Sequence, residues 1–158
     1  MSSQVAAWID AGVFVLVLIP IVLSDIRDHR VPDRWVVLGG LLLLLRRLIV
    51  SLHLGLWSLL FAAMGFVFIW IVWYVSRGKI GLGDAKLSGL IALFLGLSGW
   101  ILALLLASLA GLAWAGIRIG RGEMTKKDRI PFAPFLGAGA GAAFTAGLLW
   151  EEVGFSAL

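Results

Sequence analysis

Long apolar segments alternate with short polar ones along the whole chain, a pattern that predicts membrane-spanning helices. Residues 8–24, 35–52, 54–76 and 134–150 are predominantly apolar, and residues 87–117 contain no ionisable side chain. A helix needs about 20 mostly apolar residues to cross the hydrocarbon core of a bilayer. Each of the first four segments fits one such helix, whereas residues 87–117 form a stretch longer than one crossing requires.

This uncharged stretch decides the topology. As one helix it would place Lys86 and Arg118 on opposite faces of the membrane, whereas a hairpin turning near GLSG (residues 96–99) would return the chain to the side it left. With the hairpin, every basic residue except Arg46 and Arg47 falls in the first, third or fifth loop. Basic loops stay in the cytoplasm, so both termini lie outside. We predict an all-α integral membrane protein, a bundle of six transmembrane helices forming a single domain over residues 1–158.

The composition supports a membrane protein and narrows its chemistry. Hydrophobic residues make up 61% of the chain and charged residues 14%, against roughly 25% charged in soluble domains. The net charge of +4 is explained by loop orientation, so no nucleic-acid partner is expected. The absence of cysteine excludes disulfides and a thiol nucleophile, and two histidines are too few for a histidine-rich metal cage. We expect no metal and no other cofactor.

The first apolar segment predicts a retained span rather than a cleaved secretory signal. No Lys or Arg precedes it, and Asp10 lies inside it. A secretory signal has a basic region ahead of its apolar core.

Three polar segments adjoin the predicted spans on the cytoplasmic side. They are SDIRDHRVPDRW (24–35), GKIGLGDAKL (78–87) and KKDRIPFAPFLGAGAG (126–141). Two aspartates in them, Asp25 and Asp84, directly adjoin apolar runs, where a carboxylate costs several kcal/mol unless it is paired, hydrated or protonated. Such acids tend to face the bundle interior and serve function, whereas Asp28 and its charged neighbours fit a solvated loop.

Asp25 and Asp84 enter from the same face, so we expect them to come together. Two carboxyl groups a few ångström apart cannot both ionise easily and share a proton. One then takes a proton from water while its protonated partner polarises a carbonyl, as in aspartic proteases. Ser24, Ser76, Ser88 and Ser108 have no His or Lys base at a recognisable spacing, but Lys79 and Lys86 leave a Ser–Lys pair open.

The three segments, in this order across six spans, resemble the type IV prepilin peptidases and the archaeal preflagellin peptidases, membrane aspartic proteases of the GxGD class. The resemblance identifies Asp25 and Asp84 as the catalytic pair, the latter in the G-x-G-D-x-K motif. It covers essentially the whole chain. The supporting motif residues are Gly81, Gly83, Lys86, Pro32 and Asp33, and the candidates for a substrate loop are Ile130, Pro131, Phe132, Pro134 and Phe135.

The resemblance implies an aspartic endopeptidase that removes a basic leader peptide from prepilin-like substrates, namely Flp pilins, pseudopilins or preflagellins. Cleavage would take place at the cytoplasmic face of the cytoplasmic (inner) membrane, and the partners would be that substrate and the lipid bilayer. The large bacterial members carry an extra region with paired CxxC motifs associated with N-methylation. This chain is similar to the short form, so methyltransferase activity is not implied. Lys86 could stabilise an ionised aspartate or extend to the headgroups.

Two other function classes compete with the peptidase. Intramembrane acids also mark ion pathways, so a small transporter or proton-coupled channel is the main alternative. Transporters often carry inverted repeats, and the two halves of this chain show no convincing repeat. The third candidate is a non-catalytic member acting as an assembly factor, which the intact aspartates disfavour.

Overall fold

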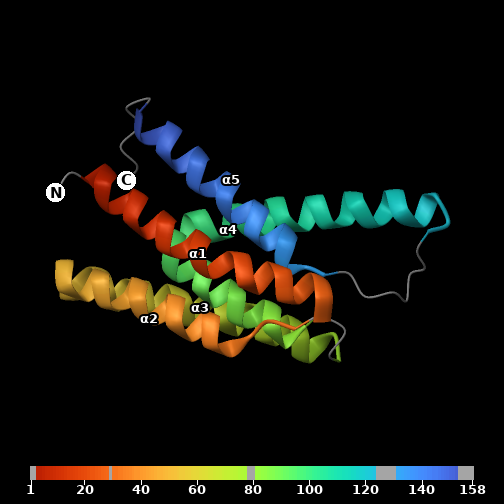
Figure 1. Cartoon of the computed structure of the whole chain (residues 1–158), viewed down its shortest axis with the longest axis horizontal. Helices are drawn as coiled ribbons and strands as arrows, with labels where there is room; N and C mark the ends of the chain where they lie inside the picture. Colours follow the sequence, from red (N-terminus) through yellow and green to blue (C-terminus); the bar gives the residue numbers. More distant parts are fainter. Residues whose placement is uncertain (1–2, 29, 78–80, 124–130, 153–158) are drawn as a thin grey trace.

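The protein is a bundle of helices (Figure 1). The computed structural model describes residues 3–28, 30–77, 81–123 and 131–152. Within these ranges the helices are α1 (Ser3–Asp28), α2 (Asp33–Val50), α3 (Leu52–Val75), α4 (Leu82–Gly120) and α5 (Ala133–Glu152). No strand occurs in the described ranges. The predicted all-helical fold is confirmed.

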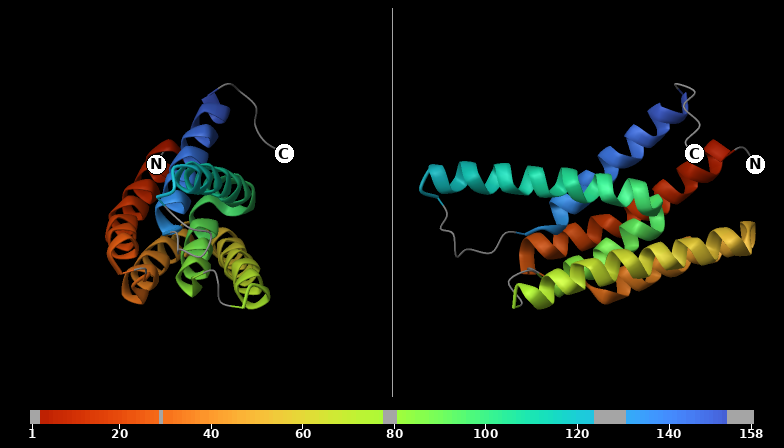
Figure 2. Two further views of the ribbon diagram at one scale, coloured as in Figure 1. Left: turned by 90° about the vertical axis from the view of Figure 1, so that its right-hand side faces the viewer. Right: turned by 180° about the vertical axis from the view of Figure 1, so that it is seen from behind.

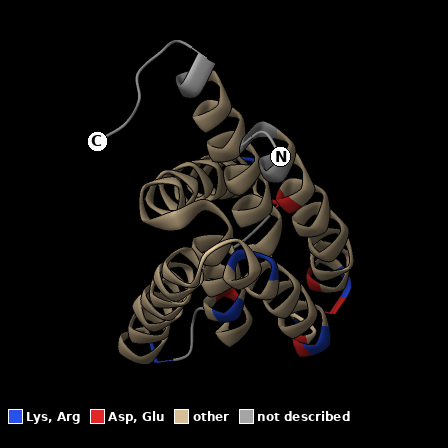
Figure 3. Ribbon diagram, turned by 90° about the vertical axis from the view of Figure 1, so that its left-hand side faces the viewer, with Lys and Arg blue, Asp and Glu red and all other residues tan. Residues whose placement is uncertain are grey.

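Three helices are long and apolar enough to cross a membrane. They are α1 over Trp8–Asp28, α3 and α4, and a shorter apolar helix covers Ala133–Leu149 of α5. Charged residues occupy only short stretches of otherwise uncharged helices (Figure 3). The outer face of α3 is largely apolar and exposed, as a surface against lipid requires. The chain is therefore a helical membrane protein, and its crossing of the bilayer in six spans stays a prediction.

Helix α4 breaks at Gly96, the first residue of the turn predicted from the sequence. Its backbone there has φ 72° and ψ −173°, outside the helical region. The chain reverses at this point, so the two arms of α4 run in opposite directions (Figures 1 and 2). We call residues 82–95 the first arm and residues 97–120 the second arm. At 1.5 Å per residue the arms are about 21 Å and 36 Å long.

The reversal returns the chain to the end of the bundle where α4 begins (Figure 1). α1 ends, α2 begins, α3 ends, and α4 and α5 begin at the same end of the bundle (Figure 1). α1 begins and α5 ends at the opposite end. Because the helices alternate in direction, the polar segments lie around the candidate acids at one end of the bundle. We call this end the acid end.

The first arm of α4 is the most buried part of the fold. Nearly every side chain from Asp84 to Phe94 is buried there. Close packing against α3 is possible because Gly65 has no side chain: a Cβ on it would lie 2.7 Å from Ala92 Cβ and 2.9 Å from the Ser88 carbonyl oxygen. The Ser88 hydroxyl donates to the Gly65 carbonyl (3.0 Å) and accepts from Trp100 Nε1 (2.8 Å). Ser88 thus ties both arms to α3.

Small residues hold the second arm of α4 against α5. Alanines and glycine spaced four apart form one buried stripe, Ala103, Ala107, Gly111 and Ala115. The Gly139 backbone of α5 lies directly on the backbone of Ala103 and Ala107. Such contacts let helix backbones approach closely in a membrane. On α5, Gly139 and Ala143 are buried, whereas Gly147 is exposed, with nothing within 4 Å of an added Cβ.

Candidate active site

Asp25 and Asp84 meet at the acid end. Asp25 lies near the end of α1 and Asp84 in the first turn of α4, and their side chains are 6% and 7% exposed. The two carboxyl groups are close enough for their charges to act on each other. Two buried acids from helices far apart in sequence therefore share one site, as the sequence predicts.

The start of α4 is built by two glycines that allow close contacts. Gly81 is the N-cap with extended backbone, and its carbonyl accepts the Asp84 backbone N–H at 3.1 Å. A Cβ on Gly81 would lie 3.2 Å from the Asp84 carboxylate. A Cβ on Gly83 would lie 2.7 Å from Val31 Cγ2. The absence of a side chain therefore leaves room for the Asp84 carboxylate at Gly81 and for Val31, in the linker before α2, at Gly83.

Asp25 also touches the beginning of α5. Its carboxylate Oδ2 accepts a hydrogen bond from the Ala133 backbone N–H at 3.1 Å. Ala133 is the first residue of α5, where backbone N–H groups lack helical acceptors and favour a negatively charged partner. Sequence reasoning missed this contact because a backbone donor has no side-chain signal. Pro131 and Pro134, close to Ala133 in the sequence, are typical of the start of a helix but do not indicate a contact with Asp25.

Lys86 pairs with Asp33 at the beginning of α2. Its ammonium group forms an ion pair with the Asp33 carboxylate. The two side chains are 31% and 67% exposed, so the pair lies at the surface of the site. Of the two roles open for Lys86, this ion pair fits the stabilisation of an ionised aspartate, with Asp33 as the partner. It joins the Pro32–Asp33 motif to the G-x-G-D-x-K motif.

The aromatic residues of the IPFAPF segment pack inward against α4. A Cβ on Gly111 would lie 3.5 Å from the Phe132 ring, and the Phe135 and Trp114 ring centroids are 5.8 Å apart. Pro131 and Pro134 are partly buried. Ile130 lies outside the described residues. This segment thus secures α5 to the second arm of α4, while its first helical N–H reaches Asp25.

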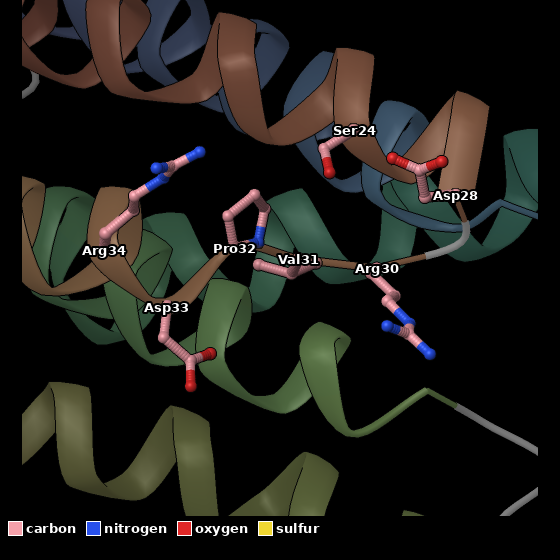
Figure 4. A pocket seen from close by; sticks show the side chains of 7 residues that line it. All are labelled: Ser24, Asp28, Arg30, Val31, Pro32, Asp33 and Arg34. Carbon is pink, nitrogen blue, oxygen red and sulfur yellow. The ribbon is translucent and has the colours of Figure 1, made fainter.

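An open pocket of about 800 Å³ lies between the end of α1 and the start of α2 (Figure 4). Its lining comes from the end of α1, the linker and the start of α2: Ser24, Asp28, Arg30, Val31, Pro32, Asp33 and Arg34. Neither Asp25 nor Asp84 lines the pocket, but Ser24 precedes Asp25 in the chain and Val31 packs against Gly83, next to Asp84. Figure 4 shows the Asp33 side chain pointing away from α1, toward its partner on α4.

The other sequence candidates for chemistry are engaged in packing. Lys86 forms an ion pair with Asp33, and the Ser88 hydroxyl is hydrogen-bonded to Gly65 and Trp100. Lys86 and Ser88 therefore do not form a Ser–Lys pair. Lys79 lies outside the described residues. Among the residues that the structure describes, no three His, Asp or Glu side chains gather in a way that would hold a metal ion. Asp25 and Asp84 stay the candidate pair for the chemistry of the site.

The chain is similar to known proteins of one family. The sequence model of the type IV leader peptidase family matches residues 12–116, which include both acids but end before the IPFAPF segment. A prepilin leader peptidase/N-methyltransferase of Bacillus subtilis (strain 168) is 31% identical over 137 residues, 87% of this chain and 55% of the relative. Proteins of the same name from Burkholderia pseudomallei (strain K96243) and Xanthomonas campestris pv. campestris are 37% and 34% identical over 51% and 50% of this chain, and 28% and 29% of their own lengths. The chain thus spans about half or less of these relatives, and no solved structure matched it.

Proposed function

Because the chain belongs to the type IV leader peptidase family, we propose that it is a membrane aspartic endopeptidase that removes leader peptides from prepilin-like proteins. The observation that carries the proposal is the meeting of Asp25 and Asp84, both buried, at one end of the bundle. The curated relatives are named prepilin leader peptidases, which supports the substrate class.

The reaction proposed for this pair is hydrolysis by a water molecule. One carboxylate takes a proton from the water as its oxygen attacks the peptide carbonyl carbon, and the protonated partner donates a hydrogen bond to the carbonyl oxygen. The tetrahedral intermediate then breaks its C–N bond, and the leaving nitrogen receives a proton from the pair. The two acids share one proton, which is the state favoured when two carboxyl groups lie close together.

The shape of the acid end suits a prepilin-like substrate. Such a protein has a basic leader followed by an apolar helix, so its cleavage point arrives where the membrane meets water. The open pocket beside Asp25 carries Asp28 and Asp33, whose charges complement a basic leader, although Arg30 and Arg34 oppose them. Its position gives an extended peptide a route to the acid pair from outside the bundle.

We also propose the cytoplasmic membrane as the location, with six spans and the acid end in the cytoplasm. All basic residues except Arg46 and Arg47 fall in or next to the connections that follow α1, α3 and α4, and positive charge favours the cytoplasmic side. Flp pilins, pseudopilins or preflagellins are the substrates proposed from the sequence. The G-x-G-D-x-K motif supports Asp84 by shaping the turn that carries it, and the Pro32–Asp33 motif supports this turn through the ion pair of Asp33 with Lys86.

The test is cleavage of a prepilin-like substrate in membranes by Asp25→Asn and Asp84→Asn variants. Each should lose at least about 100-fold in rate, since positioned acids and bases contribute roughly 10²–10⁴-fold. Glu123→Gln is the matched control. Glu123 pairs with Arg118 at the far end of α4, so this variant should cleave the substrate at the wild-type rate. Either Asn variant at the wild-type rate refutes the acid pair, and a wild-type chain that cuts no prepilin-like protein refutes the function.

A further inference from the structure

A second group of charged side chains lies inside the bundle, at the end opposite Asp25 and Asp84. Asp10 of α1 is 5% exposed and forms an ion pair with Arg46 of α2, through both carboxylate oxygens. Arg47 Nε lies 3.8 Å from the same carboxylate. Charged groups in a membrane protein are costly and are retained where they serve a purpose. The proposed peptide cleavage uses none of the three.

Arg47 differs from Arg46 in what it holds. Its guanidinium group donates to the Ser58 hydroxyl of α3 at 2.6 Å and to the Phe94 carbonyl oxygen of α4 at 2.7 Å. A planar guanidinium can direct donors at two partners at once, which an ammonium group does less well. Arg47 therefore links α2 with α3 and with the first arm of α4, while the hydrogen bonds of Arg46 go to Asp10.

The Phe94 carbonyl needs a partner because the helix breaks two residues later. The last carbonyl groups of a helix have no intrahelical N–H donor. Gly96 is non-helical, so Phe94 lies in the last turn of the first arm. Water usually satisfies such a group, but a buried end inside a membrane bundle requires a protein donor. The positive charge of Arg47 also complements the negative end of the helix dipole.

We propose that Arg47 is a positioning residue for Asp84. The first arm carries Asp84 in its first turn and accepts the Arg47 hydrogen bond in its last turn. A short rigid helix transmits a shift at one end to the other, so Arg47 sets how far the arm extends toward Asp25. A misplacement of about 1 Å at a reacting group can lower a rate by roughly 100-fold. The inference rests on the proposed peptidase function.

The experiment compares the same substitution at two neighbouring positions. Arg47→Lys keeps the charge but weakens the double hydrogen bond, whereas Arg46→Lys keeps the pairing with Asp10. For Arg47→Lys we expect kcat to fall at least about threefold with KM unchanged, and for Arg47→Gln at least about tenfold. Arg46→Lys should keep kcat within about twofold. The graded loss at Arg47 separates a role in positioning from a general loss of folded protein.

A cross-link measures the position of the first arm without using activity. The chain has no native cysteine, so a Gly40→Cys and Leu90→Cys pair reports only the contact between α2 and the first arm, where the two residues adjoin. The disulfide yield should fall in the Arg47 variants and stay unchanged with Arg46→Lys. Arg47→Lys with wild-type kcat and wild-type yield, or equal losses from Arg46→Lys, overturns the proposal. A wild-type chain without cleavage would refute the function alone, because the yield still tests the position.

Discussion

The backbone N–H of Ala133 donates a hydrogen bond of 3.1 Å to the carboxylate of Asp25. The first residue of α5 thus touches an acid at the end of α1, although more than 100 residues separate them in the chain. Since Asp25 also lies beside Asp84, three helices contribute directly to the acid end. The start of α5 is part of the candidate active site and not only of the scaffold.

Replacing Ala133 with proline should lower the cleavage rate. Proline is tolerated at the first position of a helix, where it removes only an N–H that the helix does not use. A hydrogen bond to a charged group contributes roughly 1.5–3 kcal/mol, so we expect a rate loss of about tenfold or more. Ala133→Thr keeps the N–H and has nearly the volume of proline, so it serves as the control at this buried position. Wild-type cleavage by Ala133→Pro would show that this contact has no catalytic effect.

Reversing the charges of the Asp33 and Lys86 pair should show whether the ion pair matters. Asp33→Lys alone places two cations together and should slow cleavage, as should Lys86→Asp alone. The double variant restores the attraction and should recover most of the rate. The effect on unfolding should stay within about 1 kcal/mol because the pair is largely exposed. The measurement is the cleavage rate of the two single variants and the double variant. A double variant slower than both single variants would contradict the pairing of Asp33 with Lys86.

A methyl group at Gly83 should disturb the turn that carries Asp84. The added Cβ would lie 2.7 Å from Val31 Cγ2, an overlap that costs roughly 1–3 kcal/mol. The Val31 Cβ would also lie only 2.8 Å away, so Val31→Gly is needed to remove both colliding atoms, and the Gly83→Ala and Val31→Gly double variant should lose less stability than the two single variants together. Thermal unfolding and cleavage should both follow this order. Additive losses in the double variant would argue against contact between the two residues.

Substituting alanine for Gly96 should destabilise the reversal in α4. The backbone angles there, φ 72° and ψ −173°, belong almost solely to glycine, and strain for another residue is roughly 1–3 kcal/mol. Gly116 is the matched control, because it lies in the second arm with nothing within 4 Å of an added Cβ. Alanine at Gly116 should be neutral or slightly stabilising, since alanine favours a helix. Equal stability of the two variants would contradict the strained turn at Gly96.

The sequence was sufficient for features that leave a local pattern. Apolar runs predicted the helices, the glycines near residue 96 predicted the break, and the acids next to apolar runs predicted Asp25 and Asp84 as partners. Contacts between distant segments leave no such pattern. Nothing near Lys86 indicates Asp33, and nothing near Arg47 indicates the Phe94 carbonyl, because each contact depends on how whole helices align. The Ala133 donor is a backbone group that any residue except proline would supply.

The first arm of α4 is surrounded by protein rather than by lipid. At about 21 Å it is shorter than a hydrocarbon core of roughly 30 Å, and Arg47 satisfies its far end. Hydrophobic mismatch acts on helices that face lipid, which tilt or bend when bilayer thickness changes. The helix that carries Asp84 has no such surface of its own to match. The length of the first arm therefore does not have to match the thickness of the membrane. The outer helices separate the acid pair from changes in lipid composition.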